Sequence, residues 1–99
     1  MPNIMKIFGY NIYFWSNENE PLEPVHVHVS KTPHANATKV WISRDGSCQR
    51  ADDNPEIPKK DLKKILHTID EFSEEIIAEW EAHFHEATFF DEQDHSLSR

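Results

Sequence analysis

The stretch Glu23-Pro24-Val25-His26-Val27-His28-Val29 decides the fold, because apolar and polar side chains alternate in it with a period of two. This alternation is typical of a half-buried β-strand, in which successive side chains point to opposite faces of a sheet. The three valines therefore line one face, and their β-branched side chains favour a packed core. His26 and His28 line the other face, about 7 Å apart at the usual strand rise.

Other segments carry strand signals of the same kind. The segments expected as strands are Ile4–Phe8, Asn11–Trp15, Thr38–Ser43 and, as a short edge segment, Ser47–Arg50. The first two form a hairpin around Gly9-Tyr10, and the turn residues Asp45-Gly46 precede the last. The expected sheet is antiparallel and has three to four strands.

A helix is expected after the sheet, from about Pro58 to about Glu86. Large apolar residues recur there at the three- and four-residue spacing of an amphipathic helix, and they are Leu62, Ile65, Leu66, Ile69, Phe72, Ile76, Trp80 and Phe84. Such a helix would extend about 43 Å, which is long for a small domain, so a bend or break near Ser73 is expected. The predicted fold class is α+β, with one long or bent C-terminal helix packed on the valine face of the sheet.

The length of 99 residues suits one domain and is too short for two independent cores. We expect a single α+β domain over residues 1–87 and an acidic, disordered tail over residues 88–99, where apolar periodicity ends. The single cysteine, Cys48, excludes an intramolecular disulfide. No apolar run is long enough for a membrane helix and no signal peptide is evident, so a cytoplasmic location is expected.

The net charge of −8 is unevenly distributed. Residues 1–50 carry five basic and four acidic side chains, whereas residues 51–99 carry five basic and fourteen acidic ones. General affinity for nucleic acid needs phosphate neutralisation by Lys and Arg, so this balance argues against it. Ten acidic residues and no Lys or Arg lie between Asp70 and Asp94. They form either a solvated helix face or a docking surface for a basic partner.

The pair His26-x-His28 is the most specific chemical signal. Two imidazoles on one strand could bind zinc or another divalent metal if a third ligand joined them, and the candidates are Glu23, Glu18 and His34. The same pair could serve as general acid and base on a phosphodiester. The alternative is a structural role, in which the rings bond to backbone or stack on Trp41. No serine or cysteine nucleophile motif accompanies them.

A single helical segment can cover only one face of the sheet, which leaves the other face open. By parity the open face holds the two histidines and Trp41, with Tyr13 and Trp15 on the adjoining strand. Exposed aromatic residues on such a face usually mark a contact with a ligand, a partner or a second copy of the chain. The partner-binding residues expected from this face and from the acidic helix are Trp41, Tyr13, Trp15, Glu71, Glu75 and Glu79.

Taken in order, several motifs resemble the small prokaryotic domain-of-unknown-function family numbered 4160. They are Met1-Pro2-x-Ile4, Gly9-Tyr10-x-Ile12-x-Phe14-x-Ser16-Asn17-Glu18, the histidine strand, the strand around Ala37–Ile42, and the helix pattern Leu62-x-x-Ile65-Leu66 … Ile76-x-x-x-Trp80. The resemblance covers about residues 1–87. It implies a single α+β domain and no established reaction, and such proteins resemble components of paired gene modules, including suspected toxin–antitoxin pairs. Position 23 is Glu here, where family members usually have Pro.

Three functions compete. The first is a small cytoplasmic regulatory protein that binds a protein partner, as a toxin–antitoxin-like component would. The second is a metal- or histidine-dependent nuclease or phosphoesterase centred on His26 and His28. The third is an acidic inhibitor that mimics nucleic acid through the segment from Asp70 to Asp94.

Overall fold

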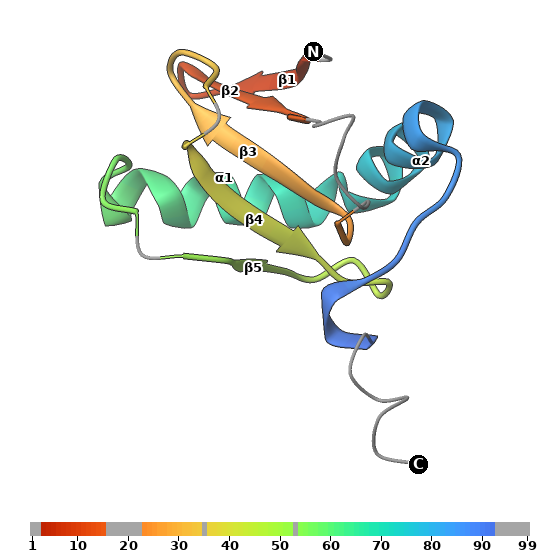
Figure 1. Ribbon diagram of the computed structural model, residues 1–99. Helices are drawn as coiled ribbons and strands as arrows, with labels where there is room; N and C mark the ends of the chain where they lie inside the picture. The colour runs from red at the N-terminus through yellow and green to blue at the C-terminus, as the bar shows by residue number, and fades with distance from the viewer. Residues whose placement is uncertain (1–2, 16–22, 35, 53, 93–99) are drawn as a thin grey trace.

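The computed structural model describes residues 3–15, 23–34, 36–52 and 54–92. Five strands form one antiparallel sheet in the order of the chain, and two helices follow (Figure 1). The strands are β1 (Asn3–Ile7), β2 (Tyr10–Tyr13), β3 (His26–Ser30), β4 (Thr38–Ile42) and β5 (Cys48–Arg50). The helices are α1 (Lys59–Glu71), α2 (Ser73–Phe84) and a short 3-10 helix, η1 (Phe90–Glu92). The α+β class is confirmed, but the sheet has five strands rather than three to four.

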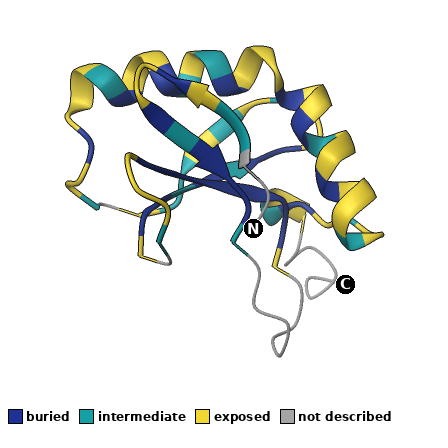
Figure 2. Ribbon diagram, turned by 90° about the horizontal axis from the view of Figure 1, so that it is seen from above, coloured by how far each residue is buried: buried dark blue, intermediate teal, exposed yellow. Residues whose placement is uncertain are grey.

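The valine face of β3 is the centre of the core. Val27 pairs with Val40 of β4, and Val29 pairs with Ile12 of β2, so apolar side chains from three strands meet on one side of the sheet. The helix residues that bury against them are Leu62, Ile65, Ile69, Ile76 and Trp80. The central strands β3 and β4 are largely buried, while the outer sides of the helices are exposed (Figure 2). The core face predicted from the alternating pattern is therefore confirmed.

The helical segment breaks at Phe72, beside Ser73, where a bend or break was expected, and it forms two helices rather than one. The backbone of Phe72 has φ −106° and ψ 18°, and α2 leaves the end of α1 at an angle (Figure 1). Ser73 takes the buried place at the start of α2, and the Phe72 ring, expected in the core, is 43% exposed. Glu74 and Glu75 now lie in the first turn of a new helix, where the helix dipole favours negative charge. The break thus places part of this acidic segment where the helix dipole stabilises it.

The hairpin between β1 and β2 turns at Phe8-Gly9, one residue earlier than expected. Ile7 pairs with Tyr10, which leaves a loop of two residues. Phe8 has φ 51° and Gly9 has φ 83°. Two successive positive φ values suit the primed turns of two-residue hairpins, and these turns favour Asn or Gly at the position that Phe8 fills.

The chain after α2 returns to the sheet. His85, in a left-handed conformation with φ 68°, ends α2, and the segment then runs past the end of β4 (Figure 1). The amide of Val25 donates to the Thr88 carbonyl at 2.8 Å, and Phe89 is only 3% exposed. An acidic, disordered tail was expected from residue 88, but the structure packs residues 88–92 against the sheet. Residues 93–99 lie outside the described residues, and for them the disordered tail stays a prediction.

Candidate functional site

His26 and His28 lie on the same face of β3, as parity predicts, and their ring centroids are 5.1 Å apart. Neighbouring strands bring aromatic rings to both. Trp41, opposite His26 in the register of β4, lies 5.7 Å from its ring, and Tyr13 of β2 stacks on His28 at 5.8 Å. The two imidazoles are thus part of one aromatic cluster on the sheet.

The two histidines are buried rather than accessible, which contradicts the expectation of an open face. Each is 5% exposed. The indole of Trp80, on α2, approaches His26 to 5.3 Å while also meeting Phe14 on the valine side at 5.2 Å. Strand parity predicts the direction in which a side chain points, but it does not predict which distant residue will cover it.

Burial keeps both imidazoles neutral. The Nδ1 of His26 lies 2.8 Å from the Pro24 carbonyl, which can only accept, so this nitrogen carries the hydrogen. Desolvation lowers the pKa of His26. Desolvation, followed by the charge of His26, lowers the pKa of His28 to about 4. The Nδ1 of His28 has no hydrogen-bond partner among the described residues. Near pH 7 the pair offers no protonated acid, and acid–base catalysis would need one.

The proposed metal ligands are only partly brought together. The Glu23 carboxylate is 4.0 Å from His26 Nδ1, but it accepts a 2.6 Å hydrogen bond from Lys39, and this bond is the main cause of its lowered pKa. His34 bonds instead to Glu56, at 3.1 Å. Glu18 lies outside the described residues. Within the described part of the chain, no three His, Cys, Asp or Glu side chains are placed to hold a metal ion.

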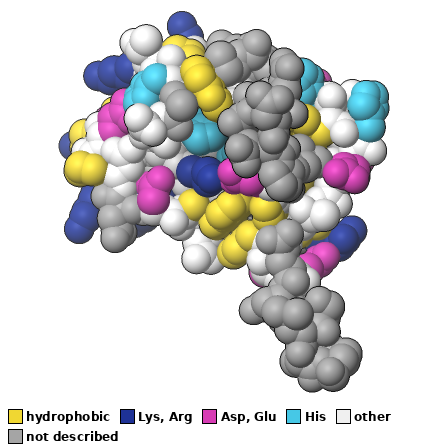
Figure 3. Space-filling view, viewed as in Figure 1, with side chains coloured by type: hydrophobic (Ala, Val, Ile, Leu, Met, Phe, Trp, Pro, Cys, Tyr) yellow, Lys and Arg dark blue, Asp and Glu magenta, His cyan; other side chains and the backbone are white. Residues whose placement is uncertain are grey.

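The aromatic residues expected on an open face are largely engaged in packing. Tyr13 is buried, and Trp15 packs edge-on against it with the ring centroids 6.3 Å apart. Trp41 is half-buried, with the Lys39 ammonium 5.0 Å from its centroid and Phe90 stacked on it. Figure 3 shows this side of the molecule, where a Lys or Arg side chain touches an Asp or Glu above a group of hydrophobic side chains. Trp15, Trp41 and Phe90 nevertheless stay partly exposed.

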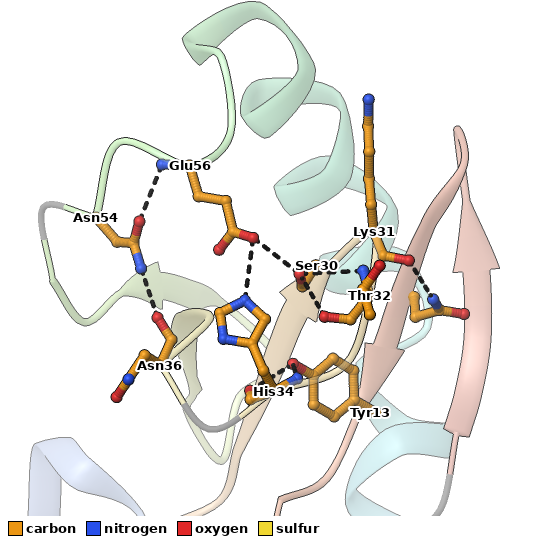
Figure 4. A network of polar contacts seen from close by, with 9 residues as sticks. Tyr13, Ser30, Lys31, Thr32, His34, Asn36, Asn54 and Glu56 are labelled. Atoms are coloured by element: carbon orange, nitrogen blue, oxygen red, sulfur yellow. Dashed lines mark hydrogen bonds and ion pairs between the residues drawn. The ribbon is translucent and has the colours of Figure 1, made fainter.

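The sequence analysis did not predict a polar network at the other end of β3 (Figure 4). The Tyr13 hydroxyl donates to the His34 carbonyl and accepts from the His34 amide, both at 2.8 Å. The Glu56 carboxylate accepts from Ser30 Oγ at 2.9 Å and bonds to the His34 ring. These partners are 21 to 26 residues apart in the chain, so no local pattern links them. The network ties two loops to the sheet.

The acidic residues predicted for partner binding are on the surface. Glu71, Glu75 and Glu79 are all exposed. A cleft of about 320 Å³ opens beside the helix break, and it is lined by Arg44, Asp45, Gly46, Glu71, Ser73, Glu74, Glu75 and Ile77. Four carboxylates and one guanidinium give this lining a formal charge of −3. The sequence analysis missed the contribution of residues 44–46, because their approach to α2 is a tertiary contact.

A family model described as "Domain of unknown function (DUF4160)" matches residues 9–81, about three quarters of the chain. The chain belongs to this family. The DUF4160 match includes β2 to β5, the helix break and Trp80, whereas the segment after α2 lies beyond it. No curated protein and no solved structure matches this DUF4160 chain. Within the described residues, no helix is both long and apolar enough to cross a membrane.

Proposed function

We propose that this DUF4160 protein is a small cytoplasmic regulatory protein that acts by binding a protein partner, as a toxin–antitoxin-like component would. The partner presents a basic segment to the surface around the helix break. This surface, called here the acidic break surface, comprises Glu71, Phe72, Glu74 and Glu75 together with the adjoining cleft. Phe72 carries the proposal, because this large apolar side chain is 43% exposed among carboxylates.

The cleft supports the choice of a basic partner. Its four carboxylates are exposed, whereas its one cation, Arg44, makes paired bonds to Glu92 at 2.9 and 3.0 Å. A hydrogen bond from the Ser47 amide lowers the pKa of Asp45, so this carboxylate stays ionised. The partly buried Ile77 adds an apolar contact within the lining. A lysine or arginine from a partner would find negative charge above and apolar surface beside its stem.

The histidine face favours binding over chemistry as the role of the protein. His26 and His28 are neutral and enclosed, and the Cys48 thiol, whose pKa burial raises to about 11, bonds to the Leu66 carbonyl. A nucleophilic cysteine needs the opposite shift, toward the thiolate. These interior side chains therefore serve packing. The exposed carboxylates that could bind a partner lie on the helices.

A peptide titration tests the proposal. A short peptide of alternating arginine and leucine, labelled for fluorescence anisotropy, should bind the parent protein and lose at least tenfold in affinity with Glu71→Lys/Glu75→Lys. Glu86→Lys, an exposed change of the same sign outside the cleft, should have a much smaller effect. Equal losses in the two variants, or no binding by the parent at low salt, would refute the acidic break surface.

The natural partner can be sought in the adjacent coding frame. Co-expression of its product with the parent should yield a complex that survives purification, and the Glu71→Lys/Glu75→Lys variant should not yield it. A complex that forms equally well with this variant would place the partner elsewhere on the molecule.

A further inference from the structure

We propose that the exposed face of α1 binds the same face of a second copy of this chain, in an antiparallel dimer with two-fold symmetry. This inference goes beyond the proposed function, because the dimer contains only two copies of this chain. It rests on the distribution of charge along α1 and on two exposed phenylalanines, one beside the basic half of that face and one just past its acidic end.

The exposed face of α1 is basic at its beginning and acidic at its end. Lys60 and Lys64, one turn apart, are exposed, and so is Glu71, two turns after Lys64 on the same side of the helix. The outer side of the helical layer is open along its length (Figure 2). When two such helices lie antiparallel, each basic half faces an acidic half, so the pattern is self-complementary under a two-fold rotation.

The two exposed large hydrophobic side chains of the described residues are Phe8, beside the basic half of this face, and Phe72, just past its acidic end. Phe8 is 61% exposed, and its ring lies 5.4 Å from the ammonium of Lys64, in the basic half of α1. Phe72 follows Glu71 directly, at the acidic end. In the antiparallel arrangement the axis passes near His67, which is also exposed. Phe8 of each copy then lies beside Phe72 of the other, and Lys64 lies opposite Glu71.

The turn at Phe8 gives an independent reason to expect a contact there. Its φ of 51° is one that bulky residues avoid and Asn or Gly accept. The fold therefore carries strained backbone and exposed apolar area at the same residue. Residues held in such conformations cluster at sites where the strain serves a contact or a switch.

The dimer uses Glu71 and Phe72, so a second copy and the proposed partner compete for one surface. Each copy would bury one helix face and two phenylalanine rings. This area is at the small end of the range for protein interfaces, so the association should be weak. Its charges are exposed, so added salt should weaken it further.

Sedimentation over a range of concentrations tests the dimer. The parent should approach a closed dimer at high concentration in low salt and dissociate in 0.5 M salt. Lys64→Glu alone and Glu71→Lys alone should each weaken dimerisation at least tenfold, because each places like charges opposite one another twice. An equimolar mixture of the two variants should restore it. Lys6→Glu, an exposed change of the same sign on β1, is the control.

The results that would overturn the dimer differ from those that would overturn the proposed function. Phe8→Asn should weaken the dimer while raising the melting temperature, because Asn suits the turn. A parent that stays monomeric, association that extends beyond the dimer, or a mixture that fails to restore pairing would overturn the dimer. Lys64→Glu leaves the acidic break surface intact, so peptide binding by this variant tests the proposed function separately.

Discussion

The ring of Phe90 stacks on the indole of Trp41, with centroids 5.7 Å apart and 12° between the ring planes. Trp41 in turn lies against His26. The segment after α2 therefore helps to cover the face of the sheet that the alternating pattern leaves polar. The histidines belong to a packed cluster that this segment completes.

Ending the chain after Ala87 should destabilise the fold strongly. The truncation removes Phe89, which is buried and lies 4.6 Å from the Arg44 guanidinium, and the carbonyl that pairs with the Val25 amide. Loss of one buried phenylalanine typically costs about 3–5 kcal/mol. Urea denaturation should show a lower midpoint, and Phe89→Ala should reproduce most of the change.

A chain that ends after Glu92 is the matched control. It keeps the contacts that Phe89 and Phe90 make within the described residues, so its midpoint should stay near that of the parent. If the chain ending at Ala87 were as stable as this control, the segment from residue 88 to residue 92 would be no part of the core.

Stability should fall as the solution is acidified from about pH 6.5 toward pH 4. The pKa of His28 is about 4 in the folded protein against 6.5 when unperturbed, so the unfolded chain takes up the proton first. This contribution is fully present above pH 6.5 and is lost as the pH approaches the folded pKa. The loss should be on the order of 3 kcal/mol for His28, and His26 should add to it in the same direction.

The slope of stability against pH shows whether His28 causes this loss. His28→Gln cannot titrate, so its stability should depend less on pH between 4.5 and 6.5, although the variant starts from a lower value because a packed ring is lost. Denaturation curves at several pH values measure both effects. A slope unchanged by the substitution would mean that His28 is protonated, or solvated, in the folded state.

Gly46→Ala should destabilise the protein for two separable reasons. Gly46 has φ 97°, and an added Cβ would lie 2.7 Å from Ser73 Oγ at the start of α2. We expect a loss of about 1–3 kcal/mol. Adding Ser73→Ala should recover the part due to the clash and leave the part due to the backbone. If Gly46→Ala had the same melting temperature as the parent, this turn would not approach α2 as closely as the structure shows.

Period-two alternation carried most of the fold prediction, because it depends only on neighbouring side chains. It placed Val25, Val27 and Val29 in the core and His26 and His28 together on the other face. It could not reveal that Trp80 reaches around to His26, since their contact joins residues far apart in the chain. The absence of periodicity after Ala87 was also misleading, because Phe89 and the single 3-10 turn that begins at Phe90 are too short to leave a periodic pattern.

A bend or break near Ser73 was foreseen, but its consequence was not. Three- and four-residue spacing is satisfied by Phe72 as well as by Ser73, so the pattern cannot decide which side chain turns inward. The approach of Gly46 to Ser73 accompanies the inward position of the smaller residue. The exposed phenylalanine and the cleft beside it both follow from that packing, and they form the surface on which the functional proposal depends.

Nuclear magnetic resonance mapping of the arginine–leucine peptide on the parent protein tests the central claim most directly. In a titration followed by amide ¹H–¹⁵N spectra, the account predicts shifts concentrated at residues 44–46 and 71–77, with the strand that carries His26 and His28 little affected. Shifts concentrated at residues 26–28 and 39–41, with residues 71–77 unmoved, would contradict it and return the function to the histidine face.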